Sequence, residues 1–92
     1  MTQELCKEVY KRFPSWDDNG ADLMDKYKDG TPQYDSDFIS KKLPEGTSVY
    51  IYGNDLYGAW VEDINVDEVH SNDLTSALLK LVIALNSSGY MK

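Results

Sequence analysis

The chain has 92 residues, which is a suitable length for one hydrophobic core, so we expect residues 1–92 to form a single compact domain. Sixteen Asp and Glu against nine Lys and Arg give a formal net charge of −7 at pH 7. Because binding to a nucleic-acid backbone depends on clusters of Lys and Arg, this charge argues against autonomous DNA binding and favours a basic partner. One cysteine leaves no pair for an internal disulfide, and no apolar run reaches the roughly 18–20 residues of a membrane span. We therefore expect a cytoplasmic protein.

Three helices are predicted in the first half of the chain. Apolar residues at three- and four-residue steps predict a helix over residues 2–13, which Pro14 ends. A capping residue and a terminal glycine predict a second short helix over residues 20–29. A third helix is predicted over residues 36–43, with Asp35 as its N-cap.

The second half of the chain begins with a β-hairpin signal. Residues 47–53 are rich in β-branched and aromatic side chains, and residues 56–64 resume the alternation after a turn-like Gly-Asn-Asp. Both faces of both strands carry bulky apolar groups, so we expect neither face to meet bulk water. Because a two-stranded ribbon is only marginally stable, a third strand is needed, and residues 65–70 are the candidate.

A strongly apolar helix is predicted over residues 73–86, with Ser71 or Asn72 as its cap and Gly89 just past its end. A helix that is apolar almost all round is buried on more than one side, against a sheet and another helix or partly in an interface. Together the elements predict an α+β fold, a short antiparallel sheet with helices on both faces.

Residue types suited to catalysis are scarce. His70 is the only histidine, and its polar neighbours are more simply explained as a helix cap than as a Ser-His-Asp triad. Cys6 lies on an apolar stripe, which favours a buried structural thiol over a nucleophile. The acidic run 25–36 fails as an EF-hand loop, because Tyr27 and Ser36 stand at ligand positions. We therefore expect no catalytic site, no metal and no cofactor.

The acidic residues are unevenly distributed. Residues 17–37 hold seven aspartates, and residues 43–79 hold seven acidic residues and no Lys or Arg. One interpretation is a solvated surface that keeps a small protein soluble. The sharper interpretation is a surface whose carboxylates occupy phosphate sites in a basic groove. The predicted partner-binding residues are the first seven aspartates and one tyrosine that would act as an anchor: Asp17, Asp18, Asp22, Asp25, Asp29, Tyr34, Asp35 and Asp37.

Three segments resemble the phage-encoded ABA-sandwich family. Residues 32–37, PQYDSD, are similar to that family's Pro-x-Tyr-Ser-Asp-like start of a helix, and Trp60 matches a tryptophan-bearing strand. Residues 75–81, TSALLKL, are similar to its terminal Ala-rich helix. The resemblance covers about residues 32–85 and implies helices on both faces of a small sheet.

In size, acidity and style the whole chain is similar to phage anti-CRISPR proteins, in particular the small inhibitors of type I-F surveillance complexes. This resemblance implies a non-catalytic inhibitor that binds CRISPR–Cas effector subunits in the cytoplasm of the infected bacterial host and blocks access of target DNA. Lys41 and Lys42 have two interpretations, contact with exposed guide RNA or a solvated helix end, of which the second is the simpler. Two alternatives stay open: a phage accessory or structural protein that binds through its apolar terminal helix, and a small enzyme.

Overall fold

The computed structural model describes residues 2–16 and 25–91. It contains three α-helices, one 3-10 turn and three strands. Their bounds in chain order are α1 Thr2–Arg12, η1 Pro14–Trp16, α2 Ser36–Lys42, β1 Thr47–Gly53, β2 Leu56–Val61, β3 Val69–Ser71 and α3 Leu74–Ser87. The predicted α+β class and the antiparallel sheet are confirmed.

The two amphipathic helices predicted at the ends of the first half are confirmed as α1 and α2. The Asp35 carboxylate accepts a hydrogen bond from the Phe38 N–H at 2.8 Å, so it caps α2 as predicted. Both helices have acidic residues in the first turn and basic residues in the last, an arrangement that favours the helix dipole.

The helix predicted over residues 20–29 is wrong for residues 25–29, which are not helical. Residues 20–24 lie outside the described part of the chain. Residues 25–33 form a tight loop closed by an isolated antiparallel bridge. The Asp29 carboxylate accepts a hydrogen bond from the Thr31 N–H at 2.9 Å, and Gly30 takes a φ of +90°. An Asp side chain that bonds the backbone two residues on stabilises a turn in place of a helix.

The sheet has the order β1-β2-β3, and both pairings are antiparallel. The third strand is confirmed, but it begins at Val69, and residues 65–68 belong to a loop. The chain leaves the sheet after β2 because Asp63 adopts a left-handed φ of 63° and the Val66 N–H closes a tight turn on the Ile64 carbonyl at 2.9 Å.

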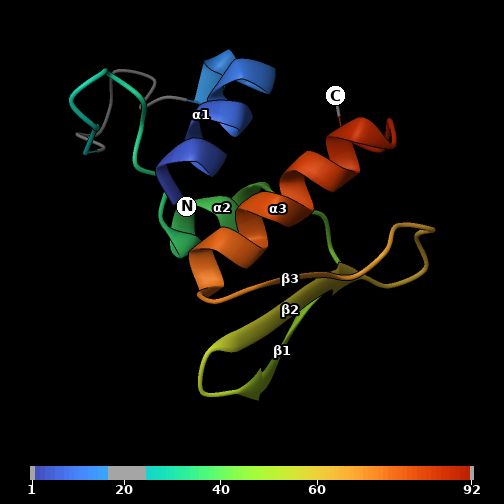
Figure 1. The fold of residues 1–92 in the computed structure, drawn as a ribbon. Coiled ribbons are helices and arrows are strands. Elements are labelled where there is room, and N and C mark those ends of the chain that lie inside the picture. The colour runs from blue at the N-terminus through green and yellow to red at the C-terminus, as the bar shows by residue number, and fades with distance from the viewer. Residues whose placement is uncertain (1, 17–24, 92) are drawn as a thin grey trace.

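Helix α3 is the centre of the packing. One side of it contacts β2 and β3, and other parts of its surface contact α1 and α2 (Figure 1). Four of its five leucines, Leu78, Leu79, Leu81 and Leu85, are buried, which confirms the prediction of a helix enclosed on more than one side. The N-cap is Asp73, one residue after the predicted candidates, because its extended backbone lets its carboxylate accept from the Ser76 N–H at 2.8 Å.

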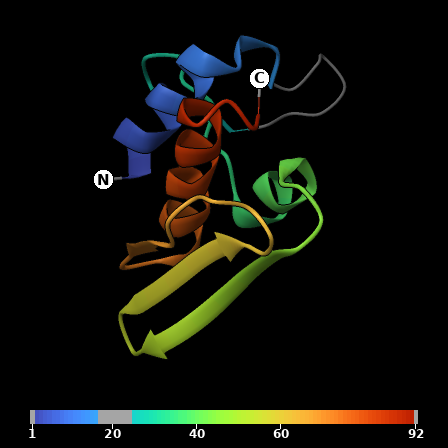
Figure 2. The ribbon, with the colours of Figure 1, turned by 90° about the vertical axis from the view of Figure 1, so that its right-hand side faces the viewer.

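The three helices lie on one side of the sheet (Figures 1 and 2). Among the described elements α3 alone contacts it, so the expected second helical layer is not found there. The expectation that neither face is exposed is also wrong, since Tyr50 is 55% and Tyr52 is 48% exposed. The apolar stripe of α1 packs against α3 and not against the sheet. On the open face of the sheet, Tyr50 and Tyr52 pack on each other with ring centroids 4.8 Å apart.

No described helix combines the length and the apolar character that crossing a membrane requires. The longest, α3, has 14 residues.

Candidate partner-binding surface

Four of the seven predicted aspartates, Asp25, Asp29, Asp35 and Asp37, are described, and they lie at separate places in the local structure. Asp17, Asp18 and Asp22 lie outside the described residues. The side chain of Asp25 is exposed, and its backbone carbonyl accepts a hydrogen bond from the Gln33 N–H at 2.8 Å. The other three are engaged in local contacts, so the described aspartates of this set do not form one free acidic surface.

Asp29, Asp35 and Asp37 each have a local role. Hydrogen bonds from Thr31 and the ammonium of Lys7, 3.0 Å away, lower the pKa of Asp29 from its usual 3.8 to about 2. Asp35 caps α2, and the Asp37 carboxylate lies 3.4 Å from the Lys41 ammonium one turn later. These contacts account for the three residues without a partner molecule.

The prediction that Tyr34 is an exposed anchor for a partner is wrong. Its side chain is 3% exposed and stacks on Phe38 at a centroid distance of 5.4 Å. The chain enters the core just before α2, and this carries the ring inward. Lys42 places its ammonium 5.5 Å from the centre of the Trp16 ring, so a cation–π contact accounts for one of the two lysines considered for RNA contact.

The candidate catalytic residues do not come together. His70 is exposed on β3, with its Nε2 3.3 Å from a Glu68 oxygen, whereas Cys6 is fully buried on the inner side of α1 and burial raises the pKa of its thiol. The buried structural thiol is therefore confirmed. Within residues 2–16 and 25–91, no group of three His, Cys, Asp or Glu is placed to hold a metal ion.

The uncovered side of the sheet carries rings, and we call Tyr50, Tyr52, Trp60 and His70 the aromatic face. Strand alternation places them together, because their neighbours Ala59 and Val61 point into the core. Tyr50 packs edge-on against Tyr52, and the Tyr52 ring lies 5.5 Å from the His70 ring.

Glu68 connects the aromatic face to the loop that follows β2. The Tyr52 hydroxyl donates a hydrogen bond to its carboxylate, and this bond raises the pKa of Tyr52. Gly58 makes this approach available, since a Cβ there would overlap the carboxylate and lie 2.6 Å from the Tyr52 ring. The lack of a side chain at Gly58 therefore leaves room for the Tyr52 ring and the Glu68 carboxylate.

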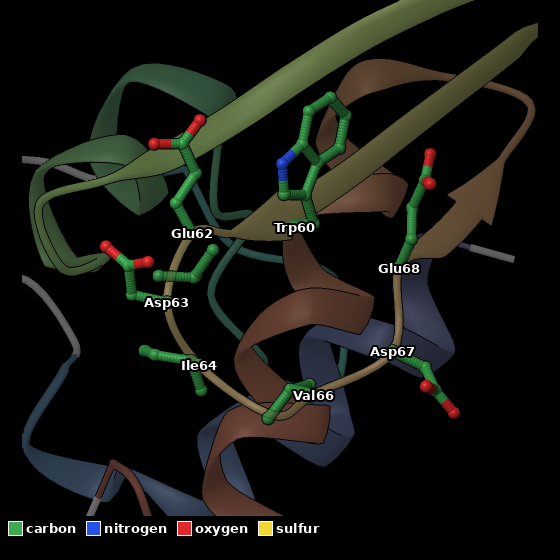
Figure 3. Close-up of a pocket in the computed structure, with 8 residues that line it drawn as sticks. Trp60, Glu62, Asp63, Ile64, Val66, Asp67 and Glu68 are labelled. Atoms are coloured by element: carbon green, nitrogen blue, oxygen red, sulfur yellow. The ribbon is translucent and has the colours of Figure 1, made fainter.

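We call residues 62–68 the acidic loop, and all of them except Asn65 line a shallow hollow together with Trp60. Figure 3 shows the indole between the carboxylates of Glu62 and Glu68, with Asp67 directed away from the hollow. Ile64 and Val66 supply the apolar part of the lining. This juxtaposition of an indole, two aliphatic side chains and the carboxylates of Glu62 and Glu68 suits a cationic side chain that also needs apolar contact.

The acidic loop stands in a strongly negative environment. It lies within the segment 43–79, which contains no Lys or Arg. The carboxylates of Glu62, Asp63 and Asp67 have no ion-pair partner among the described residues, whereas Glu68 lies near His70. The uneven charge was visible in the sequence, but the turns that gather it beside Trp60 were not.

Comparisons with known proteins identify no relative of this chain. No protein-family model matches it, and neither a curated protein nor a solved structure does.

Proposed function

We propose that this chain is a non-catalytic binding protein that engages a basic protein surface through its aromatic face and acidic loop. The observation that carries the proposal is the position of Trp60 between the carboxylates of Glu62 and Glu68, beside exposed tyrosines. Arg and Lys of a partner gain charge-assisted hydrogen bonds from such carboxylates and stacking contacts from the rings.

A protein that binds nucleic acid is the partner class that fits this surface best. Its groove presents Arg and Lys spaced for phosphates, and carboxylates of the acidic loop would compete for the same side chains. Within this class we propose the surveillance complex of a CRISPR–Cas system, of the Cascade type, in the cytoplasm of an infected bacterium. Occupying the strand groove would block target DNA without any chemical step.

The competing proposal, an accessory protein that binds through its apolar terminal helix, has less support. Most apolar residues of α3 are buried against the sheet and the other helices, and Leu74, Ile83 and Ala84 are only partly exposed, so little of that surface is left for a partner. A concentration-dependent oligomer that survives high salt would favour this alternative.

The test compares two sets of four neutralised carboxylates in binding to the purified surveillance complex. The first set is in the acidic loop: Glu62→Gln, Asp63→Asn, Asp67→Asn and Glu68→Gln. The second set changes the net charge equally in the first half: Asp17→Asn, Asp18→Asn, Asp22→Asn and Asp25→Asn.

We expect the loop variant to weaken binding at least tenfold at 150 mM salt, because each charge-assisted hydrogen bond contributes about 1.5–3 kcal/mol. The first-half variant should differ from the wild type by less than threefold. Equal losses in both variants would show that only net charge matters. Unchanged binding in both would rule out an acidic competitor, and wild-type affinity of the loop variant alone would exclude this surface.

A further inference from the structure

Strand β1 is an open edge of the sheet. The order β1-β2-β3 leaves one side of β1 without a strand partner among the described residues, and no described helix packs against it (Figures 1 and 2). An unpaired edge presents backbone N–H and C=O groups that can pair with another chain.

The register identifies which backbone groups face that edge. The Glu62 N–H donates to the Gly46 carbonyl at 3.1 Å, so these two residues bond across the start of the ladder. Bonded and non-bonded pairs alternate in an antiparallel ladder, and Val49 and Ile51 fall at the non-bonded pairs. Their N–H and C=O groups therefore point away from β2, toward the open edge.

The side chains of β1 lack the usual protection of an edge strand. Its sequence, TSVYIYG, contains no charged residue and no proline, although native edges are commonly blocked by a lysine, a proline or a bulge. A register irregularity occurs only near the end of the strand, between Ile51 and Gly53. Ile51 is 63% exposed, so an apolar side chain stands at the edge without cover.

Both sides of β1 offer contacts for an added strand. On the helix side a hollow lies between α2 and β1, lined by apolar groups of Leu43, Pro44, Val49 and Leu78. On the other side the aromatic face presents Tyr50. Alternate residues of an added strand would meet these two surfaces.

Charge selects the occupant. Glu45 lies just before β1 and Asp55 just after it. In antiparallel pairing of two copies, Glu45 of one copy would approach Asp55 of the other at both ends, and like charges would repel. A segment with Lys or Arg at both ends would instead meet an opposite charge at each end.

We propose that β1 takes up an extended segment of the partner as a fourth strand, with β-branched or apolar residues in the middle of that segment and basic residues at both ends. The inference rests on the proposed function for the basic character of the partner. It adds a binding mode in which backbone hydrogen bonds provide affinity.

The test uses a synthetic nine-residue peptide with alternating Val and Thr in the middle and two Lys at each end. Titration into the protein is followed by NMR of the backbone amides. We expect the Val49 and Ile51 amides to shift and to exchange with solvent at least tenfold more slowly, since they would become donors to the peptide. A matched peptide with Glu at the ends should bind at least tenfold more weakly.

A proline variant isolates the backbone contribution. Val49→Pro removes an N–H that faces the edge and leaves the β1–β2 ladder intact, as proline is tolerated at such positions. Val49→Thr is the control, because it keeps the N–H and a β-branched side chain. We expect about tenfold weaker peptide binding for the proline variant and less than threefold change for the control. Ile51→Pro, against Ile51→Thr, repeats the test in case one variant fails to fold.

Three results would overturn the proposal: no protection of Val49 and Ile51 at millimolar peptide, equal binding by the proline and threonine variants, or protection without peptide that rises with protein concentration. The last would assign the edge to a second copy. The outcome is separable from the proposed function. If the surveillance complex binds the proline and threonine variants equally but binds the loop variant more weakly than the wild type, the proposal of strand addition is wrong and the proposed function of the acidic loop is retained.

Discussion

The two faces of strand β2 differ in what covers them. On the inner face, Ala59 and Val61 are buried under α3, and on the outer face Trp60 has no helix above it. Ala59 and Val61 of the covered face are small, whereas the open face carries large rings, of which Tyr50 and Tyr52 are in contact with each other. Apolar content alone therefore does not indicate which face of this sheet packs against the core, because both faces carry apolar side chains.

The acidic residues show a second contrast. Carboxylates at residues 29–37 cap a helix, close a turn or pair with a lysine, so their charge is used within the fold. Three carboxylates of the acidic loop have no ion-pair partner in the described part of the chain. Charge that the fold leaves unpaired is the charge available to a partner.

The largest expected effect separates the covered face from the open face. Leu79→Ala, at a fully buried position of α3, should lower the free energy of unfolding by about 2–5 kcal/mol, because it leaves a cavity in the core. Tyr50→Ala on the aromatic face should cost about 1 kcal/mol, the value of an aromatic pair. Urea denaturation measures both, and equal losses would mean that the aromatic face is part of the core.

An intermediate effect is expected at Gly58. Gly58→Ala places a methyl group against the Tyr52 ring and the Glu68 carboxylate, and should cost about 1 kcal/mol because both side chains can swing outward. Loss of their hydrogen bond should bring the pKa of Tyr52 down toward its ordinary value. NMR titration of the tyrosine Cζ resonances measures this change, and an unaltered Tyr52 pKa would contradict the role given to the glycine.

The smallest effect concerns pH and Asp29. Its pKa is lowered in the folded state, so its contribution to stability is fully present above its unfolded pKa near 3.8 and is lost as pH falls through about 2. Asp29→Asn should flatten the fall in stability between pH 5 and pH 2, measured by urea midpoints. An equal flattening in Asp37→Asn, the matched control, would assign the slope to general charge.

Local signals in the sequence were sufficient for most elements. The steps of apolar residues and the cap at Asp35 located α1 and α2, and alternation located the hairpin. The prediction of a helix over residues 20–29 was wrong for its described part because the Asp29 side chain stabilises a turn. The capping residue and the terminal glycine that predicted the helix give no information on such a side-chain hydrogen bond. The cap of α3 was displaced by one residue, since Ser71, Asn72 and Asp73 are all good caps.

The surface was harder to predict than the fold. Both faces of the sheet carry apolar side chains, but α3 covers only one of them, and the sequence does not indicate which one. Tyr34 was expected to be exposed on composition alone, although the chain enters the core at that point. The acidic loop lay in the more negative half, but only the turns at Asp63 and Ile64 bring Glu68 back beside Trp60, opposite Glu62.

The central position of α3 determines when the domain can fold during synthesis. Among the described elements, α1 and α2 have no contact with each other or with the sheet, and each packs against α3. A nascent chain that has not yet released residues 74–87 from the ribosome therefore lacks the helix that α1, α2 and the sheet all pack against, and its hairpin is uncovered. The contacts of Trp16 with Phe38 and Lys42 are then what joins the first helices. Cooperative folding has to wait until α3 emerges, and until then the apolar strands are exposed to chaperones and to other nascent chains.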